Sequence, residues 1–181
     1  TKYYYGGDAD FTNMRSYLVS QGINDIVSDM SFPVKDRMSK WGVPDDKLFE
    51  RLKADLKDDR IGTPMLRIIQ TSSSHEPFDV PYNRPADERL NAFAFADSCI
   101  GNFVSALKAS PQWKSSLVIL LPDHQGCWPI GISNEDLGHY HIPMIWTGGA
   151  LAKGGEVDII GSQQDLAATL LGQLNINHDD M

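Results

Sequence analysis

The sequence has 181 residues, of which 41% are hydrophobic, and this is enough for one domain with a hydrophobic core. Its 24 acidic and 16 basic residues give a formal net charge of −8, and no cluster of basic residues is present, so the composition argues against a general nucleic-acid-binding protein. Because we find no run of roughly 18 apolar residues and no charged-then-apolar leader, we expect neither a membrane span nor an export signal in these residues. The two cysteines, Cys99 and Cys127, lie in such different contexts that we expect no disulfide framework.

Apolar runs of strand length alternate with helical patterns along the chain, which predicts an α/β fold with a mostly parallel sheet flanked by helices. We expect strands within residues 2–7, 23–29, 65–71, 117–121 and 141–149. We expect helices within residues 10–22, 43–59, 88–110 and 162–176.

The predicted helices carry recognisable end signals. Asp10 precedes the first helix as a candidate cap, and Ser162 begins the last one. In the second helix, Pro44 stands in the first turn, followed by acidic residues and by one apolar face. The third helix is apolar over much of its circumference, which predicts a well-packed position.

Side chains of the types that bind metal ions or transfer protons follow two of the predicted strands. His75 follows the strand at 65–71, and the pair Asp123 and His124 follows the strand at 117–121. Ligands of open parallel sheets bind beyond the carboxyl ends of the strands, so we expect these two strands to be adjacent or one apart and the three side chains to share a cleft. A carboxylate with imidazoles suits a divalent ion such as Zn, Mn or Mg. The alternative is a helix-capping Asp and an ordinary surface His.

Other histidines and tryptophans are weaker candidates. His139 and His141, two apart on a strand, would point to the same face and would chelate a metal, but the pattern also fits a loop His followed by a strand-opening one. Trp128 is close enough in sequence to Asp123 and His124 to wall the cleft. We expect Trp41 to pack on the domain instead.

Five segments together resemble the sulfatase-like part of the alkaline phosphatase superfamily, and within it the lipoteichoic acid synthase and phosphoglycerol transferase branch. They occur in the family's order and rough spacing and cover nearly the whole chain. The segments are YYYGGDADFTNM, TSSSHEPF, LVILLPDHQG, HIPMIWTGG and SQQDLAATLLGQLNI.

The resemblance implies an alkaline-phosphatase-like fold and a metal-dependent transfer or hydrolysis of anionic phosphate or sulfate esters. It implies that Asp123 and His124 ligate a divalent ion (Mn, Mg, Ca or Zn) and that His75 contacts the transferred group or the leaving oxygen. It also implies a place on the extracytoplasmic face of a bacterial inner membrane or in the periplasm, with transmembrane helices upstream.

Two features of the chain differ from the complete family pattern. The resemblance implies that residues 1–181 are the C-terminal portion of a catalytic domain, and that the hydroxyl or modified-Cys nucleophile and the first acidic ligand belong to an N-terminal half. Members that polymerise glycerol phosphate place a Trp and an Arg where this chain has Thr12 and Met14, which favours a different anionic ester. A non-catalytic α/β module that binds a ligand or partner through the same cleft is the alternative function.

Overall fold

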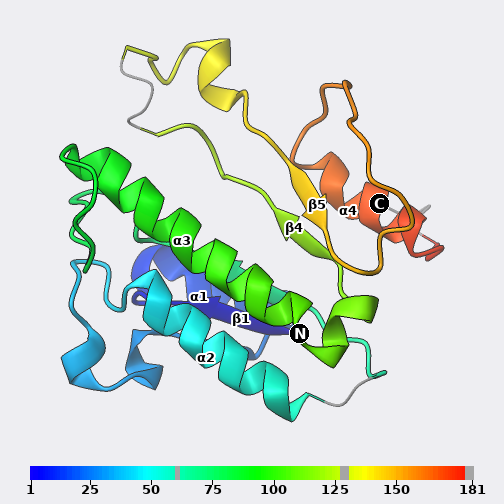
Figure 1. Cartoon of the computed structure of the whole chain (residues 1–181), viewed down its shortest axis with the longest axis horizontal. Coiled ribbons are helices and arrows are strands. Elements are labelled where there is room, and N and C mark those ends of the chain that lie inside the picture. Colours follow the sequence, from blue (N-terminus) through cyan, green and yellow to red (C-terminus); the bar gives the residue numbers. More distant parts are fainter. Residues whose placement is uncertain (60–61, 127–130, 178–181) are drawn as a thin grey trace. The chain divides into compact units, whose positions relative to one another are not determined.

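The computed structural model of the protein describes residues 1–59, 62–126 and 131–177, and it divides the chain into two units, Thr1–Leu151 and Ala152–Met181 (Figure 1). The predictions for Cys127 and Trp128 lie outside the described residues. The strands of the first unit are β1 (Lys2–Tyr5), β2 (Asp25–Val27), β3 (Arg67–Gln70), β4 (Val118–Leu120) and β5 (Ile145–Thr147). Its α-helices are α1 (Met14–Ser20), α2 (Asp45–Asp58) and α3 (Glu88–Lys108). Its 3-10 helices are η1 (Phe11–Asn13), η2 (Asp29–Ser31), η3 (Val34–Asp36), η4 (Pro111–Ser115) and η5 (Leu137–Tyr140).

The parallel sheet has the strand order β2-β1-β3, with Tyr3 of β1 opposite Ile26 and Ile68. Helices cover both faces, because successive side chains of a strand point to opposite sides. Tyr4 packs with α2 and α3, whereas Tyr3 and Tyr5 pack with Leu18 of α1. This arrangement confirms the predicted α/β fold with a parallel sheet flanked by helices.

The second pair of strands is antiparallel. β4 pairs with β5 so that Ile119 lies opposite Trp146, and this pair is a separate sheet from β2-β1-β3. The expectation that the strands at 65–71 and 117–121 are adjacent or one apart in one sheet is therefore wrong. An apolar run predicts that a strand forms. It does not predict which strand pairs with it or in which direction, because pairing depends on tertiary packing and on the course of the connecting chain.

The main core lies between the sheet and the helix pair α2 and α3. Leu48, Phe49 and Leu52 of α2 are buried there, as the apolar face of the predicted helix requires. Phe49 stacks on Phe103 of α3, with 5.3 Å between the ring centroids. Burial of such large apolar side chains is the dominant stabilising contribution to this unit.

Helix α3 begins after Asp87, whose side chain accepts hydrogen bonds from the backbone N–H groups of Arg89 and Leu90. By length and composition α3 is apolar enough to cross a membrane, a test that the core helices of soluble proteins also pass. In this structure its buried residues are part of the core. Among them is the free thiol of Cys99, whose pKa burial raises to about 12, so that it stays protonated at neutral pH.

Two helix starts differ from the predictions. Thr12 and Asn13 have left-handed backbones, so α1 starts only at Met14, and the Asp10 carboxylate accepts a hydrogen bond from Arg15 Nε at 2.8 Å instead of capping the helix. In the second unit, α4 (Asp165–Gln173) starts three residues after the expected Ser162. Intrinsic helix signals place a terminus only to within a few residues.

One partly buried ionic cluster ties β1 to α2. The Asp55 carboxylate accepts hydrogen bonds from Tyr4 Oη at 2.9 Å and Arg51 Nε at 2.9 Å, and Lys2 Nζ lies 2.8 Å away. Burial acts to raise the pKa of Asp55, but the three donors outweigh it and lower the pKa from 3.8 to about 2. The folded-state pKa is thus below the unfolded one, so the cluster stabilises the fold above pH 3.8 and this contribution is lost as the pH falls through about 2.

We predict that Asp55→Asn lowers the free energy of unfolding by about 2 kcal/mol at neutral pH, as the pKa shift implies. Urea unfolding measured from pH 7 downwards checks this, and the difference from the wild type should shrink between about pH 4 and pH 2. Asp58→Asn, at the exposed end of α2, is the control and should show no such pH dependence. A difference independent of pH would contradict the ionic explanation.

Candidate active site

The first predicted site residue, His75, lies in the loop that follows β3. Its backbone is fixed by two turns, in which His75 N donates to Ser72 O and Phe78 N donates to His75 O, each at 3.0 Å. The exposed imidazole has Nδ1 3.1 Å from the carbonyl oxygen of Glu76. A carbonyl oxygen only accepts, so Nδ1 carries the proton of this hydrogen bond and Nε2 is left for another partner.

A buried carboxylate holds the start of this loop. Asp45, the first residue of α2, is fully buried and accepts hydrogen bonds from Ser72 N at 3.0 Å and Ser73 N at 3.3 Å. Its own N–H donates to Ser73 Oγ at 2.9 Å. Burial raises the pKa of the Asp45 carboxyl, against the opposing effect of these hydrogen bonds. The sequence signals around Pro44 predict only a helix start, and no local pattern indicates that Asp45 also holds the loop of His75.

Glycines bring the segment before α2 against the end of β1. Val43 N donates to Gly6 O at 2.8 Å. A Cβ on Gly6 would lie 2.3 Å from Val43 O, and one on Gly42 would lie 2.4 Å from Gly6 O. Gly42 also has a φ of +108°, which side-chain-bearing residues rarely adopt. Only glycine therefore permits this approach, which places Trp41 beside the loop of His75.

Trp41 is half-buried and lies against His75, with 4.7 Å between the ring centroids and an edge-to-face arrangement. Phe11, which is exposed and follows the end of β1, also contacts the Trp41 ring edge to face, with 5.9 Å between the ring centroids. Trp41 therefore packs on the domain, as expected from the sequence, and one of the side chains that it packs against is His75. The position of Trp41 depends on the glycine contact, which no local pattern around residue 41 reveals.

The second group of site residues, Asp123 and His124, lies in the loop after β4. Asp123 Oδ1 accepts a hydrogen bond from His124 N at 2.9 Å, and Asp123 Oδ2 is 3.5 Å from His124 Nε2. His124 Nδ1 donates to the carbonyl oxygen of Gln125 at 2.7 Å. This contact leaves the Nε2 lone pair of the neutral ring available beside a carboxylate whose side chain is 87% exposed. Such a pair fits two positions in the ligand set of a divalent ion.

His139 supports this loop from the side. It lies in η5 and not in a strand, so His139 and His141 do not form the strand pair considered from the sequence. The buried His139 ring stacks on His124 with 5.2 Å between centroids. Gln125 N donates to His139 O at 3.0 Å, and Gln125 Nε2 donates to His141 O at 2.7 Å. These contacts restrict where His124 can point.

The described residues contain no group of three or more His, Cys, Asp or Glu side chains that could hold a metal ion. The His75 ring packs on Trp41, and the His124 ring stacks on His139. The candidate residues thus lie in two loops, with His75 in the loop after β3 and Asp123 and His124 in the loop after β4.

The stretch at Phe11–Met14 contains no cationic side chain. Thr12 has a left-handed backbone with a φ of 55°. Met14 packs against the cluster of Tyr3, Tyr5 and Leu18. The side chain at position 14 is therefore a partly buried apolar contact of this cluster.

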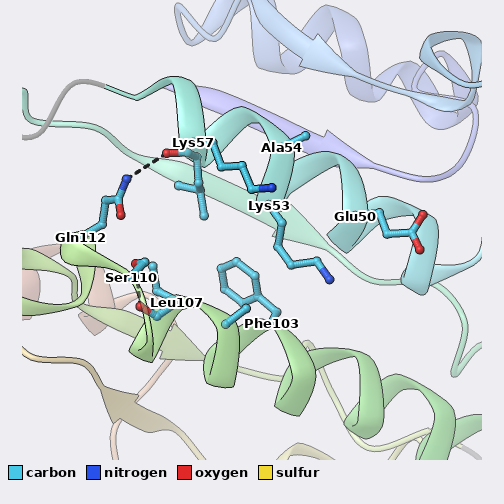
Figure 2. Close-up of a pocket in the computed structure, with 10 residues that line it drawn as sticks. Glu50, Lys53, Ala54, Lys57, Phe103, Leu107, Ser110 and Gln112 are labelled. Atoms are coloured by element: carbon cyan, nitrogen blue, oxygen red, sulfur yellow. Dashed lines mark hydrogen bonds between the residues drawn. The ribbon is translucent and has the colours of Figure 1, made fainter.

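A further pocket lies between α2 and α3 (Figure 2). Phe103 and Leu107 of α3 face Lys53 and Lys57 of α2 across it. At one end, Gln112 Nε2 donates to the backbone oxygen of Leu56 at 3.0 Å. None of the predicted site residues lines this pocket.

The sulfatase family model matches residues 1–176, almost the whole chain. The chain belongs to the sulfatase family. This confirms the resemblance drawn from the five sequence segments. The match extends over both described units, so the second unit is part of the same family domain.

Curated relatives of this sulfatase-family chain are phosphoglycerol transferases I. That of Xanthomonas campestris pv. campestris strain B100 is 26% identical over 138 residues, covering 67% of this chain and 20% of the relative. That of Xanthomonas axonopodis pv. citri strain 306 is 27% identical over an alignment of 192 residues, covering 93% and 26%. The chain thus spans about a quarter or less of the length of these relatives.

Two solved structures share the fold over 98% of this chain. One is a protein in the alkaline phosphatase superfamily from Vibrio parahaemolyticus, with a TM-score of 0.85 and 26% identity, of which the chain covers 45%. The other is the lipoteichoic acid synthase LtaP from Listeria monocytogenes, with a TM-score of 0.83 and 21% identity, of which the chain covers 50%. The chain therefore has an alkaline-phosphatase-like fold and corresponds to about half of each of these structures.

We predict that Asp45→Ala destabilises the fold by about 2 kcal/mol, because it leaves the N–H groups of Ser72 and Ser73 without their acceptor. Urea unfolding measures the loss. Asp58→Ala is the matched control, since it removes an exposed carboxylate from the other end of the same helix. Amide hydrogen exchange at Ser72 and Ser73 should accelerate in Asp45→Ala only, and unchanged exchange would contradict the assigned anchor.

Proposed function

We propose that this chain is part of a metal-dependent enzyme that transfers or hydrolyses phosphate or sulfate esters. The observation that carries the proposal is the Asp123 and His124 pair, which in a sulfatase-family chain presents a carboxylate beside an imidazole with Nδ1 already bonded. Family membership supports the class of enzyme. The metal, the substrate and the residue roles are parts of the proposal.

Asp123 and His124 would hold a divalent ion of the Mn, Mg, Ca or Zn group. Their oxygen and nitrogen donors suit these ions, and the Gln125 carbonyl fixes the tautomer in which His124 Nε2 is the ligand atom. When bound, the ion would neutralise charge on the ester oxygens and favour attack on the phosphorus or sulfur atom.

His75 would contact the transferred group or the leaving oxygen. Since its Nδ1–H is bonded to Glu76 O, Nε2 is the atom that would face the ester. In the protonated ring, Nε2–H would donate a hydrogen bond, and then the proton, to the leaving oxygen. The loop anchored on Asp45 would keep this nitrogen in place during the reaction.

The remaining parts of the site would come from protein outside this chain. The chain corresponds to about half of each similar solved structure. We propose that residues 1–181 are the C-terminal portion of the catalytic domain, and that the nucleophile and the first acidic ligand lie in an N-terminal portion. The extracytoplasmic location and an upstream membrane anchor belong to the same proposal.

The proposed substrate is an anionic ester other than a teichoic acid precursor. Thr12 and Met14 stand where the glycerol-phosphate-polymerising branch has a Trp and an Arg, and Met14 is a partly buried apolar contact. A guanidinium that would hold a second phosphate bidentately is therefore lacking at this position. This favours a substrate with one phosphate or sulfate group near the site.

In the full-length enzyme, we predict that Asp123→Asn and His124→Ala lose bound metal and turnover of an aryl phosphate or sulfate ester. We predict that His75→Ala keeps the metal but lowers turnover by about 10²- to 10⁴-fold, the usual effect of removing a positioned acid or base. Metal analysis and ester turnover are measured side by side for all three variants.

His141→Ala is the control, because its exposed side chain can be removed while its carbonyl still accepts from Gln125. It should retain both metal and turnover. Loss of metal in His75→Ala would show that His75 is a ligand. Full activity in all three variants would refute the enzyme and favour a module that only binds a ligand or partner.

We predict that the 181-residue chain by itself binds Mn²⁺ or Zn²⁺ weakly and has no ester turnover. Asp123 and His124 supply two ligands, whereas tight protein sites generally use three or four. Calorimetric titration of the wild type and His124→Ala measures the affinity. A tight 1:1 site that survives His124→Ala would contradict the assignment.

A further inference from the structure

We infer that Trp41 is a positioning residue for His75, acting through the carbonyl group of Glu76. The inference rests on the proposed role of His75 for its functional meaning, but not for its geometry. Trp41 Nε1 donates to Glu76 O at 2.5 Å, and His75 Nδ1 donates to the same oxygen at 3.1 Å. One carbonyl oxygen has two lone pairs, so it accepts from both rings at once.

The shared carbonyl sets the tautomer of His75. With Nδ1 protonated towards Glu76 O, Nε2 of the neutral ring is the nitrogen left to take up the proton that the protonated ring would donate to the leaving oxygen. The Trp41 N–H holds the Glu76 oxygen in the direction that this tautomer needs. Without Trp41, the carbonyl would be free to turn to water, and the preference for Nδ1–H would weaken.

The indole ring also limits rotation of the imidazole. The two rings meet edge to face at 67° with 4.7 Å between centroids. Phe11 packs on Trp41 at 71°, and Lys40 Nζ lies 5.7 Å from the centroid of the Trp41 ring. Trp41 is thus held by neighbours on other sides, and His75 meets a fixed surface.

The backbone around Trp41 has two separate anchors. Lys40 N donates to Asp79 Oδ2 at 3.1 Å, which ties this segment to the loop of His75. On the other side, the contact of Gly42 and Val43 with Gly6 ties it to the end of β1. Trp41 therefore stands between two ordered segments, as a residue that orients a neighbour must.

The test is the tautomer of His75, measured by long-range ¹H–¹⁵N correlation at a pH of about 8.5, where imidazoles are neutral. The wild-type chain should show mainly Nδ1–H. Trp41→Phe keeps a ring but has no N–H, and we expect the ratio of Nδ1–H to Nε2–H to fall about fivefold, the effect of one ordinary hydrogen bond. Trp41→Leu removes the ring as well and should lower it further.

Trp146→Phe is the matched control. Its Nε1 donates to Met144 Sδ at 3.0 Å in β5, so the variant removes an indole N–H elsewhere. It should leave the His75 signals unchanged. A wild-type His75 that is mainly Nε2–H, or a ratio that is the same in Trp41→Phe as in the wild type, would overturn the inference.

Turnover of the full-length enzyme separates this inference from the proposed function. For Trp41→Phe we expect kcat to fall about tenfold, with KM and metal content nearly unchanged, because positioning acts on the reacting group. If the wild type turns over no ester, the proposed function fails while the tautomer result stands. If the tautomer shifts but kcat does not, His75 is positioned by Trp41 without being the acid, and the functional part of the inference is overturned.

Discussion

The arrangement of this chain depends on the buried carboxylate of Asp45. It is fully buried, and it accepts the backbone N–H groups of Ser72 and Ser73 while its own N–H donates to Ser73. A buried carboxylate is costly unless it is hydrogen-bonded, so this contact strongly disfavours any other path for the loop after β3. Because the loop carries His75, a residue remote from the chemistry defines where the imidazole stands.

The segment that precedes Asp45 extends the same constraint to β1. Gly6 and Gly42 let the end of β1 and the segment before α2 approach at positions where any side chain would clash. This approach places Trp41 against the His75 ring. The result is a rigid frame of backbone contacts around an exposed imidazole, which is what a positioned acid or base requires. The loop of Asp123 and His124 is built differently, through Gln125 and the stacked ring of His139.

The two loops differ in how they are held, but their histidines share one feature. The sulfatase family model covers residues 1–176, and the solved structures establish the fold. In both His75 and His124, Nδ1 points at a backbone carbonyl oxygen. This contact favours the Nδ1–H tautomer in each ring and leaves Nε2 available. That shared feature suits one ring for hydrogen bonding an ester and the other for binding an ion.

By itself the sequence determined the positions of most elements and the residues of interest at strand ends. The apolar face of α2 is a local periodicity, which is why it could be predicted. Only the tertiary structure decided that β4 pairs with β5, that Asp45 anchors the loop of His75, and that Trp41 lies on its ring. Each of these joins residues far apart in sequence through backbone hydrogen bonds or close glycine contacts, and such contacts leave no periodic signal in the chain.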